Sequence, residues 1–179
     1  MWITTVARAP WEANGSSGRV DLMSSMIRIV IAEDDPGLRE LFREQLSCVP
    51  DFEVIGEACD GRQAVATVGR LDPDILTLDI DLPGIGGLEV LPVVRWYSPK
   101  TKVIALSSHD EEATLLEALE LGARGYIVKG DGTNLEKAIR AVQRGEVWAG
   151  RRVLARVLSQ LVGLAGRTFQ EAGGEPAHA

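Results

Sequence analysis

Short apolar stretches and amphipathic stretches alternate along the chain from residue 27 to about residue 144. The apolar stretches are nearly continuous, as in IRIVIA and VIALSS, which predicts strands that are buried on both sides. The five predicted strands cover residues 27–32, 52–59, 74–79, 102–107 and 124–128. Each strand is followed by apolar residues at helical spacing, and the five predicted helices cover residues 36–48, 60–70, 88–97, 111–121 and 134–144. This alternation predicts an α/β protein.

The connections between these elements are short and carry helix-start signals. Asp35 is a predicted N-cap with Pro36 at the first helical position, and Asp60-Gly61 is a predicted turn into the second helix. Strands that alternate with helices pair in parallel, and right-handed crossovers place the helices on both faces of the sheet. The predicted fold is therefore a doubly wound, five-stranded parallel sheet.

The domain is predicted to span residues 26–146, with three segments outside it. Residues 1–25 are rich in Gly, Ser and Ala and lack periodicity, which predicts a disordered extension. Residues 147–162 predict an extra C-terminal helix that docks on its own domain or forms a dimer seam. Its apolar stripe consists of Val153, Leu154, Val157, Leu158 and Leu161. Residues 163–179 are predicted to be a disordered tail.

The length of 179 residues is typical of a single domain. Charge is distributed unevenly along the chain. Residues 27–150 contain 13 Lys and Arg against 22 Asp and Glu, a net charge of −9, whereas residues 151–179 carry +2. Binding to a nucleic-acid backbone needs clustered Lys and Arg. We therefore expect no specific DNA binding by this chain alone.

The cysteines and the hydropathy bear on the compartment. Cys48 and Cys59 form no CxxC pair and have no neighbouring His, which is typical of free thiols in a reducing compartment. No apolar run reaches the length of a signal peptide or a membrane span. We expect a cytoplasmic protein that does not contact a membrane.

Polar residues follow the predicted strands at the points where those strands end. Glu33 and Asp34 follow the first strand, Asp79 closes the third, Ser107 closes the fourth and Lys129 follows the fifth. The carboxyl ends of parallel strands meet at one edge of a sheet, where ligands bind in such folds. Taken alone, Asp79 in LTLDIDLP also fits a turn residue before Pro-Gly, and Lys129 a solvated surface lysine.

Together these groups predict a site for phosphoryl chemistry. Three neighbouring carboxylates repel one another, and oxygen ligands of this kind suit Mg²⁺. A lysine and a hydroxyl beside them can bind a phosphoryl group, and an aspartate can form an aspartyl phosphate. The cation and the lysine would stabilise the charge that develops during transfer.

Four motifs carry a resemblance to a known family: VIAEDDPGLRE, LTLDIDLPGIGGLEVL, VIALSSHDE and GARGYIVKGD. With them, residues 26 to about 146 resemble the receiver domain of two-component response regulators. The resemblance implies a flavodoxin-like fold with strand order 2-1-3-4-5, as in the receiver that is a standard example of this order. It also implies phosphorelay signalling: a sensor histidine kinase donates a phosphoryl group to an aspartate, and the domain switches conformation without being an enzyme.

The resemblance also assigns roles to the residues that match its motifs. Asp79 resembles the phosphorylated aspartate, and Lys129 the lysine that contacts the phosphate. Asp34 would bind Mg²⁺ directly, Glu33 would act through water, and Asp81 would offer its backbone carbonyl. Ser107 matches the hydroxyl that follows the phosphoryl group on activation, and Tyr126 the aromatic side chain that then turns inward.

Two alternatives stay open at the level of sequence. Asp79-Ile80-Asp81 fits the DxD start of phosphatases that form an aspartyl phosphate, although Pro83 and the third-strand position depart from that pattern. LEKAIRAVQRGEVWAGRRVLARVLSQL resembles the linker of NarL/FixJ-type DNA-binding regulators, which makes a truncated regulator the second alternative. Output is expected through a homodimer or a partner protein, by the face of the fourth helix and fifth strand or by the C-terminal helix.

Overall fold

The computed structural model describes residues 26–130 and 135–150, which contain five strands and five helices. The strands are β1 (Ile27–Ala32), β2 (Phe52–Ala58), β3 (Ile75–Asp79), β4 (Lys102–Ser107) and β5 (Gly125–Val128). The helices are α1 (Pro36–Ser47), α2 (Gly61–Leu71), α3 (Gly87–Tyr97), α4 (Glu112–Glu120) and α5 (Leu135–Gln143). Every boundary lies within one residue of its prediction, apart from the start of α5, which coincides with the start of a described range.

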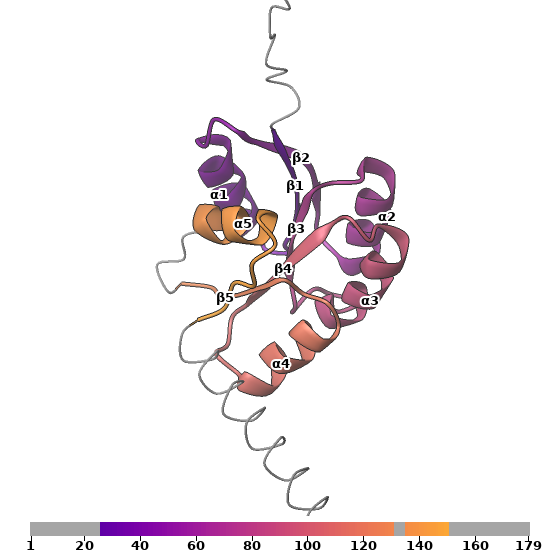
Figure 1. Cartoon of the computed structure of the whole chain (residues 1–179). Coiled ribbons are helices and arrows are strands. Elements are labelled where there is room, and N and C mark those ends of the chain that lie inside the picture. Colours follow the sequence, from indigo (N-terminus) through magenta and orange to yellow (C-terminus); the bar gives the residue numbers. More distant parts are fainter. Residues whose placement is uncertain (1–25, 131–134, 151–179) are drawn as a thin grey trace, which may run out of the picture.

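The five strands form one parallel sheet in the order β2-β1-β3-β4-β5. Helices α1 and α5 cover one face of the sheet, and α2, α3 and α4 cover the other (Figure 1). The predicted doubly wound fold with the flavodoxin-like order 2-1-3-4-5 is confirmed.

Two apolar cores lie on opposite faces of the sheet because successive strand residues point in opposite directions. In β1, Val30 and Ala32 pack into the core beneath α2, α3 and α4, whereas Ile29 and Ile31 pack into the core beneath α1 and α5. All four side chains are fully buried. Complete burial of a Val or Ile side chain contributes about 1.5–3 kcal/mol, so the buried central strands contribute strongly to the stability of the fold.

The first two helices begin where the sequence places a capping aspartate. Asp35 Oδ1 accepts a hydrogen bond from the amide of Leu38 at 2.8 Å, and Asp60 Oδ1 accepts one from the amide of Gln63 at 2.8 Å. Each cap satisfies an amide that has no partner within its helix. Among the described residues, no helix combines the length and the apolar character that crossing a membrane requires.

The segment after α5 differs from its prediction. Residues 147–150 are not helical: Trp148 forms an isolated parallel bridge with Gly125 at the edge of the sheet. The Tyr126 amide donates to the Trp148 carbonyl at 2.8 Å, and the Trp148 amide donates to the Arg124 carbonyl at 3.0 Å. Free backbone groups of an edge strand favour this extended pairing over a helical turn. The remainder of the predicted helix, with its apolar stripe, and the predicted extension and tail lie outside the described residues.

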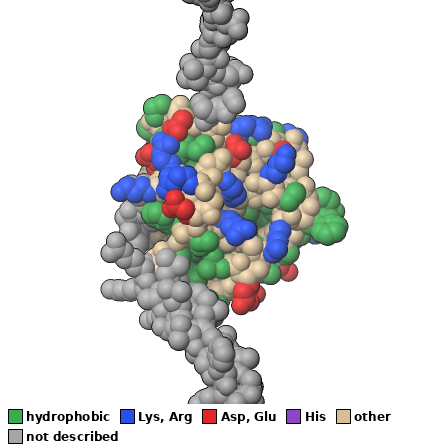
Figure 2. All heavy atoms as spheres, viewed as in Figure 1, with side chains coloured by type: hydrophobic (Ala, Val, Ile, Leu, Met, Phe, Trp, Pro, Cys, Tyr) green, Lys and Arg blue, Asp and Glu red, His purple; other side chains and the backbone are tan. Residues whose placement is uncertain are grey.

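Charged residues stand at both ends of the strands. Acidic residues follow the carboxyl ends of β1 and β3, whereas the amino ends carry both signs: Arg28, Lys102 and Arg124 at β1, β4 and β5, and Asp51 and Asp74 before β2 and β3. Figure 2 shows one face on which Lys and Arg side chains gather, although the body is acidic overall. The net charge therefore does not describe the local environment at either edge.

Candidate functional site

The carboxyl ends of β1, β3 and β5 bring four charged side chains together. Glu33 and Asp34 follow β1, Asp79 is the last residue of β3, and Lys129 follows β5. Strands β1 and β3 are direct neighbours, so their ends lie side by side at one edge of the sheet. The structure thus gathers four of the predicted site residues from three segments of the sequence.

Three carboxylates form the acidic part of this site. Glu33, Asp34 and Asp79 each offer an oxygen, and these oxygens lie within 4.8 Å of one another. Glu33 is 0% and Asp79 1% exposed, whereas Asp34 is exposed to solvent. An arrangement of oxygen ligands this close, with one carboxylate facing water, is suited to a hard divalent cation.

Lys129 bridges the two buried carboxylates. Its Nζ lies 2.7 Å from Asp79 Oδ2, 2.8 Å from Glu33 Oε2 and 3.1 Å from Glu33 Oε1. Burial lowers the pKa of Lys129, but its hydrogen bonds to Asp79 and Glu33 outweigh this and raise the pKa above its ordinary value. The ammonium therefore stays protonated and neutralises part of the acidic cluster.

Glu33 is held in an environment that disfavours its charge. Burial raises the pKa of the Glu33 carboxyl, the hydrogen bond from Lys129 opposes the rise, and the nearby charge of Asp79 adds to it. Without Lys129, or another cation in its place, the buried Glu33 and Asp79 carboxylates would face each other with no positive charge between them, which is energetically costly. The site is therefore built to contain a positive charge.

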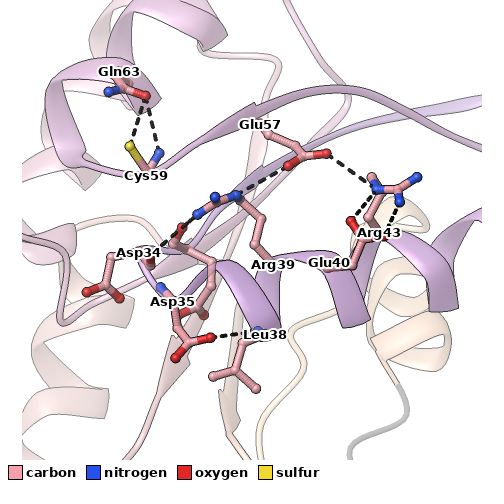
Figure 3. Close-up of polar contacts among 10 residues, drawn as sticks. Asp34, Asp35, Leu38, Arg39, Glu40, Arg43, Glu57, Cys59 and Gln63 are labelled. Atoms are coloured by element: carbon pink, nitrogen blue, oxygen red, sulfur yellow. Dashed lines mark hydrogen bonds and ion pairs between the residues drawn. The ribbon is translucent and has the colours of Figure 1, made fainter.

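Arg39 fixes the backbone that carries the acidic pair, a role that sequence reasoning missed. From α1, its Nη1 donates to the Glu33 carbonyl at 2.6 Å, and its Nε lies 3.3 Å from Glu57 Oε2 on β2. Figure 3 shows this guanidinium between Asp34 and Glu57, with the Asp34 carboxylate pointing away from it. The sequence signal that could have indicated this role is the position of Arg39, one helical turn after the N-cap Asp35. Arg39 leaves the Asp34 carboxylate free to face the site.

Asp81 contacts the site through its backbone. Its amide donates to Asp79 Oδ1 at 3.1 Å, while its side chain is exposed. This hydrogen bond orients the Asp79 carboxylate so that Oδ2 faces Lys129. The role assigned to the Asp81 carbonyl stays a prediction.

Ser107 and Tyr126 meet at the backbone of His109. The Ser107 hydroxyl donates to the His109 carbonyl at 2.8 Å, and the Tyr126 hydroxyl donates to the same carbonyl at 3.2 Å. Both side chains are buried, and burial raises the pKa of Tyr126. The Lys129 amide donates to the Ser107 carbonyl at 2.7 Å, which joins this pair to the charged cluster. Tyr126 lies inward in this structure, and the turn assigned to it on activation stays a prediction.

Residues 29–140 match the sequence model of the response regulator receiver domain. The chain belongs to this family. The match includes every residue of the charged cluster, and it extends from β1 into α5. The receiver identity expected from the motifs is confirmed.

Relatives of this receiver include regulators of the NarL type. The nitrate/nitrite response regulator NarL of Escherichia coli is 35% identical over 120 residues, which are 66% of this chain and 56% of NarL. The transcriptional regulatory protein YxjL of Bacillus subtilis is 32% identical over 151 residues, which are 84% of this chain and 69% of YxjL. The receiver thus spans little more than half of NarL and about two-thirds of YxjL.

Solved structures give the same result. The receiver domain of NarL from Mycobacterium tuberculosis is 36% identical, with a TM-score of 0.64 over 68% of this chain and 99% of that one. A LuxR-family response regulator from Aurantimonas is 30% identical, with a TM-score of 0.71 over 77% of this chain and 99% of that one. The fold is therefore shared with response regulators of known structure.

Proposed function

We propose that this receiver accepts a phosphoryl group on Asp79 from a sensor histidine kinase in the cytoplasm and signals by changing conformation. The observation that carries the proposal is the buried Asp79 carboxylate, 2.7 Å from Lys129 and grouped with two further carboxylates. A buried aspartate with a paired lysine is an unusually ordered nucleophile. An aspartate that only capped the turn before Pro83-Gly84 would need neither the lysine nor the neighbouring carboxylates.

The transfer step follows from these positions. An oxygen of Asp79 forms a bond to phosphorus while the bond between phosphorus and the donor imidazole nitrogen breaks. The electron pair leaves with that nitrogen, and an imidazole protonated at its other nitrogen departs neutral. Lys129 is close enough to Asp79 to move its ammonium onto a phosphoryl oxygen and offset the added charge.

A divalent cation completes the proposed site. Asp34 and Asp79 would bind Mg²⁺ directly, Glu33 through water, and Asp81 through its backbone carbonyl. When bound, Mg²⁺ supplies the charge stabilisation that phosphoryl transfer depends on. The all-oxygen donor set, with exposed Asp34 leaving room for water, fits a cation that keeps part of its hydration shell.

The proposed switch lies at the end of β4. The Ser107 hydroxyl donates to the His109 carbonyl, and a phosphoryl group on Asp79 would offer it a charged acceptor instead. The Tyr126 hydroxyl donates to the same carbonyl. When the His109 carbonyl loses the Ser107 donor, the hydrogen bonding of the loop that leads into α4 therefore changes. The phosphate thereby shifts the equilibrium between two existing conformations of this loop.

The test of function uses acetyl phosphate as donor. In the presence of Mg²⁺, we expect intact-mass measurement to show a gain of about 80 Da, corresponding to one phosphoryl group. EDTA should prevent the gain because the acidic cluster then lacks its cation. We expect almost no turnover of a small phosphate ester such as p-nitrophenyl phosphate. Steady turnover would support the phosphatase alternative and contradict a receiver without enzyme activity.

Metal affinity gives a second prediction. Lys129→Met removes a cation that lies within 2.8 Å of two carboxylates and competes with Mg²⁺ for them. We expect Mg²⁺ to bind about tenfold more tightly in calorimetry, because relief of this repulsion is worth at least about 1.4 kcal/mol. Asp34→Ala should weaken binding. Lys100→Met is the matched control and should leave affinity unchanged; equal effects of both lysine substitutions would contradict a competition at the site.

We propose that output passes through the α4 and β5 face, either to a second copy of the chain or to an output protein. The alternative is a transcriptional regulator, favoured by the names of the NarL and YxjL relatives. The acidic body offers little attraction for DNA phosphates. A gel shift at physiological salt against promoter fragments near the gene separates the two, since only a regulator gives sequence-selective binding.

A further inference from the structure

A polar pocket lies at the edge of the sheet opposite the phosphoacceptor site. It is formed by the C-terminal ends of α3 and α4, the start of β4 and the residue before β5, and it encloses about 680 Å³. This volume is in the range of small-molecule sites. Its floor is apolar, with Leu91, Val103 and Leu119, and its charged lining residues are all cations: Arg95, Lys100, Lys102 and Arg124.

Three of these cations have no acidic partner within residues 26–130 and 135–150. Lys102 donates to the Gln143 carbonyl at 2.8 Å, but Arg95, Lys100 and Arg124 form no side-chain hydrogen bond or ion pair there. Four arginines elsewhere in the described residues do form ion pairs, as in the contact of Arg140 with Asp51. Within the described part of the chain, three cations without an acidic partner line one concavity, which favours an anionic ligand there.

The backbone around Arg95 and Arg124 is fixed by packing and by hydrogen bonds. Gly122 has a φ of +112°, and a Cβ built there would lie 3.1 Å from Arg95 Cδ, so the absent side chain makes room for the arginine. The Arg124 amide donates to the Val103 carbonyl at 2.8 Å, and its carbonyl accepts from Trp148 at 3.0 Å. Both guanidinium-bearing residues are therefore held on a fixed backbone.

The turn that carries Lys100 is fixed by buried hydroxyl groups. The Ser98 hydroxyl donates to Asp72 Oδ1 at 2.6 Å and lies 2.9 Å from Thr101 Oγ1, which donates to the Pro73 carbonyl at 2.6 Å. Attraction to a helix C-terminus accounts for Arg95 in the last turn of α3, but Lys100 and Arg124 lie outside the helices. The helix dipole therefore does not explain the cluster.

We propose that this pocket binds a small ligand carrying two or more phosphate groups. Guanidinium groups match phosphate oxygens in paired hydrogen bonds, and an ammonium adds a compact charge. Arg95, Lys100 and Arg124 come from three different backbone segments and would together contact adjacent phosphate groups. A nucleoside diphosphate and inorganic pyrophosphate share this chemistry, and the apolar floor offers a surface for a base.

The test is calorimetry with pyrophosphate and with ADP on the 179-residue chain, in buffer containing EDTA. Without free divalent cations, phosphate contacts at the acidic cluster do not contribute. We expect Arg95→Gln and Arg124→Gln each to weaken binding about tenfold or more, because each removes charged hydrogen bonds. Tighter binding of ADP would assign a role to the base, and equal binding would restrict recognition to the phosphates.

Two further variants test whether binding depends on the pocket rather than on surface charge or on the phosphoacceptor. Arg70→Gln removes an exposed arginine of α2 that does not line the pocket and should leave affinity unchanged. Asp79→Asn should also bind normally, so failure of the proposed phosphoryl transfer would not affect this result. Circular dichroism checks that each variant is folded. No binding at millimolar probe, or equal losses in Arg70→Gln and Arg124→Gln, would overturn the proposal.

Discussion

Asp79→Asn is expected to lose the mass gain from acetyl phosphate completely. The substitution replaces the carboxylate with an amide of the same shape, which cannot attack phosphorus at neutral pH. It also removes the acceptor charge that lies 2.7 Å from Lys129 and an oxygen from the carboxylate cluster. Intact-mass spectrometry should show labelling of the wild type, and the variant should fall to background, at least about a hundredfold lower.

Asp81→Asn is the matched control for this experiment. Asp81 is two residues away and exposed, and the contact it makes with Asp79 comes from its backbone amide, which the substitution retains. It should therefore label like the wild type. Urea denaturation of both variants checks that they remain folded. Full labelling of Asp79→Asn would move the phosphoacceptor to another residue.

Local pattern was sufficient to predict the fold because the strands carry an unambiguous signal. In β1, every residue from Ile29 to Ala32 is buried, and Asp35 with Pro36 marks the start of α1. The bridge of Trp148 to β5 escaped prediction because it depends on a free strand edge, which no local pattern encodes. Sequence predicts elements well where burial and capping agree, and less well where a distant partner decides.

The site shows the same division. The ends of parallel strands identified Asp79 and Lys129 as neighbours, although fifty positions separate them. The detailed contacts were not predictable, because Lys129 also reaches Glu33, and Arg39 reaches back over the acidic loop. Side-chain direction depends on the rotamers that the packed environment allows, not on order along the chain. The inward Tyr126 is a further case, since its hydroxyl is fixed by the His109 carbonyl.

Net charge was the least informative of the sequence measures. The −9 of residues 27–150 conceals four cations that line one pocket at the edge of the sheet opposite Asp79. A parallel sheet places all strand starts at one edge and all strand ends at the other, so residues far apart in sequence meet in one local environment. An average over the chain does not report the charges that line a single pocket.

Gly87 packs directly against the backbone of Asp79, the proposed phosphoacceptor. It is the first residue of α3, and its amide donates to the Ile80 carbonyl at 3.0 Å, which closes the loop after β3. A Cβ built on Gly87 would lie 2.3 Å from the Asp79 carbonyl oxygen and 2.6 Å from the Ile80 Cα. Both are backbone atoms, so no side-chain rotation can relieve the contact.

Gly87→Ala is therefore expected to destabilise the protein by about 3 kcal/mol, because the loop and the end of β3 must move apart. Urea denaturation should show the loss, and labelling by acetyl phosphate should slow because Asp79 moves with its backbone. Gly69→Ala is the matched control: Gly69 lies inside α2, and an added Cβ meets nothing within 4 Å. It should stabilise by about 0.5–1 kcal/mol through helix propensity. Similar unfolding midpoints for the two variants would contradict close backbone packing at Asp79, whereas opposite shifts would show that this glycine maintains the backbone geometry around Asp79.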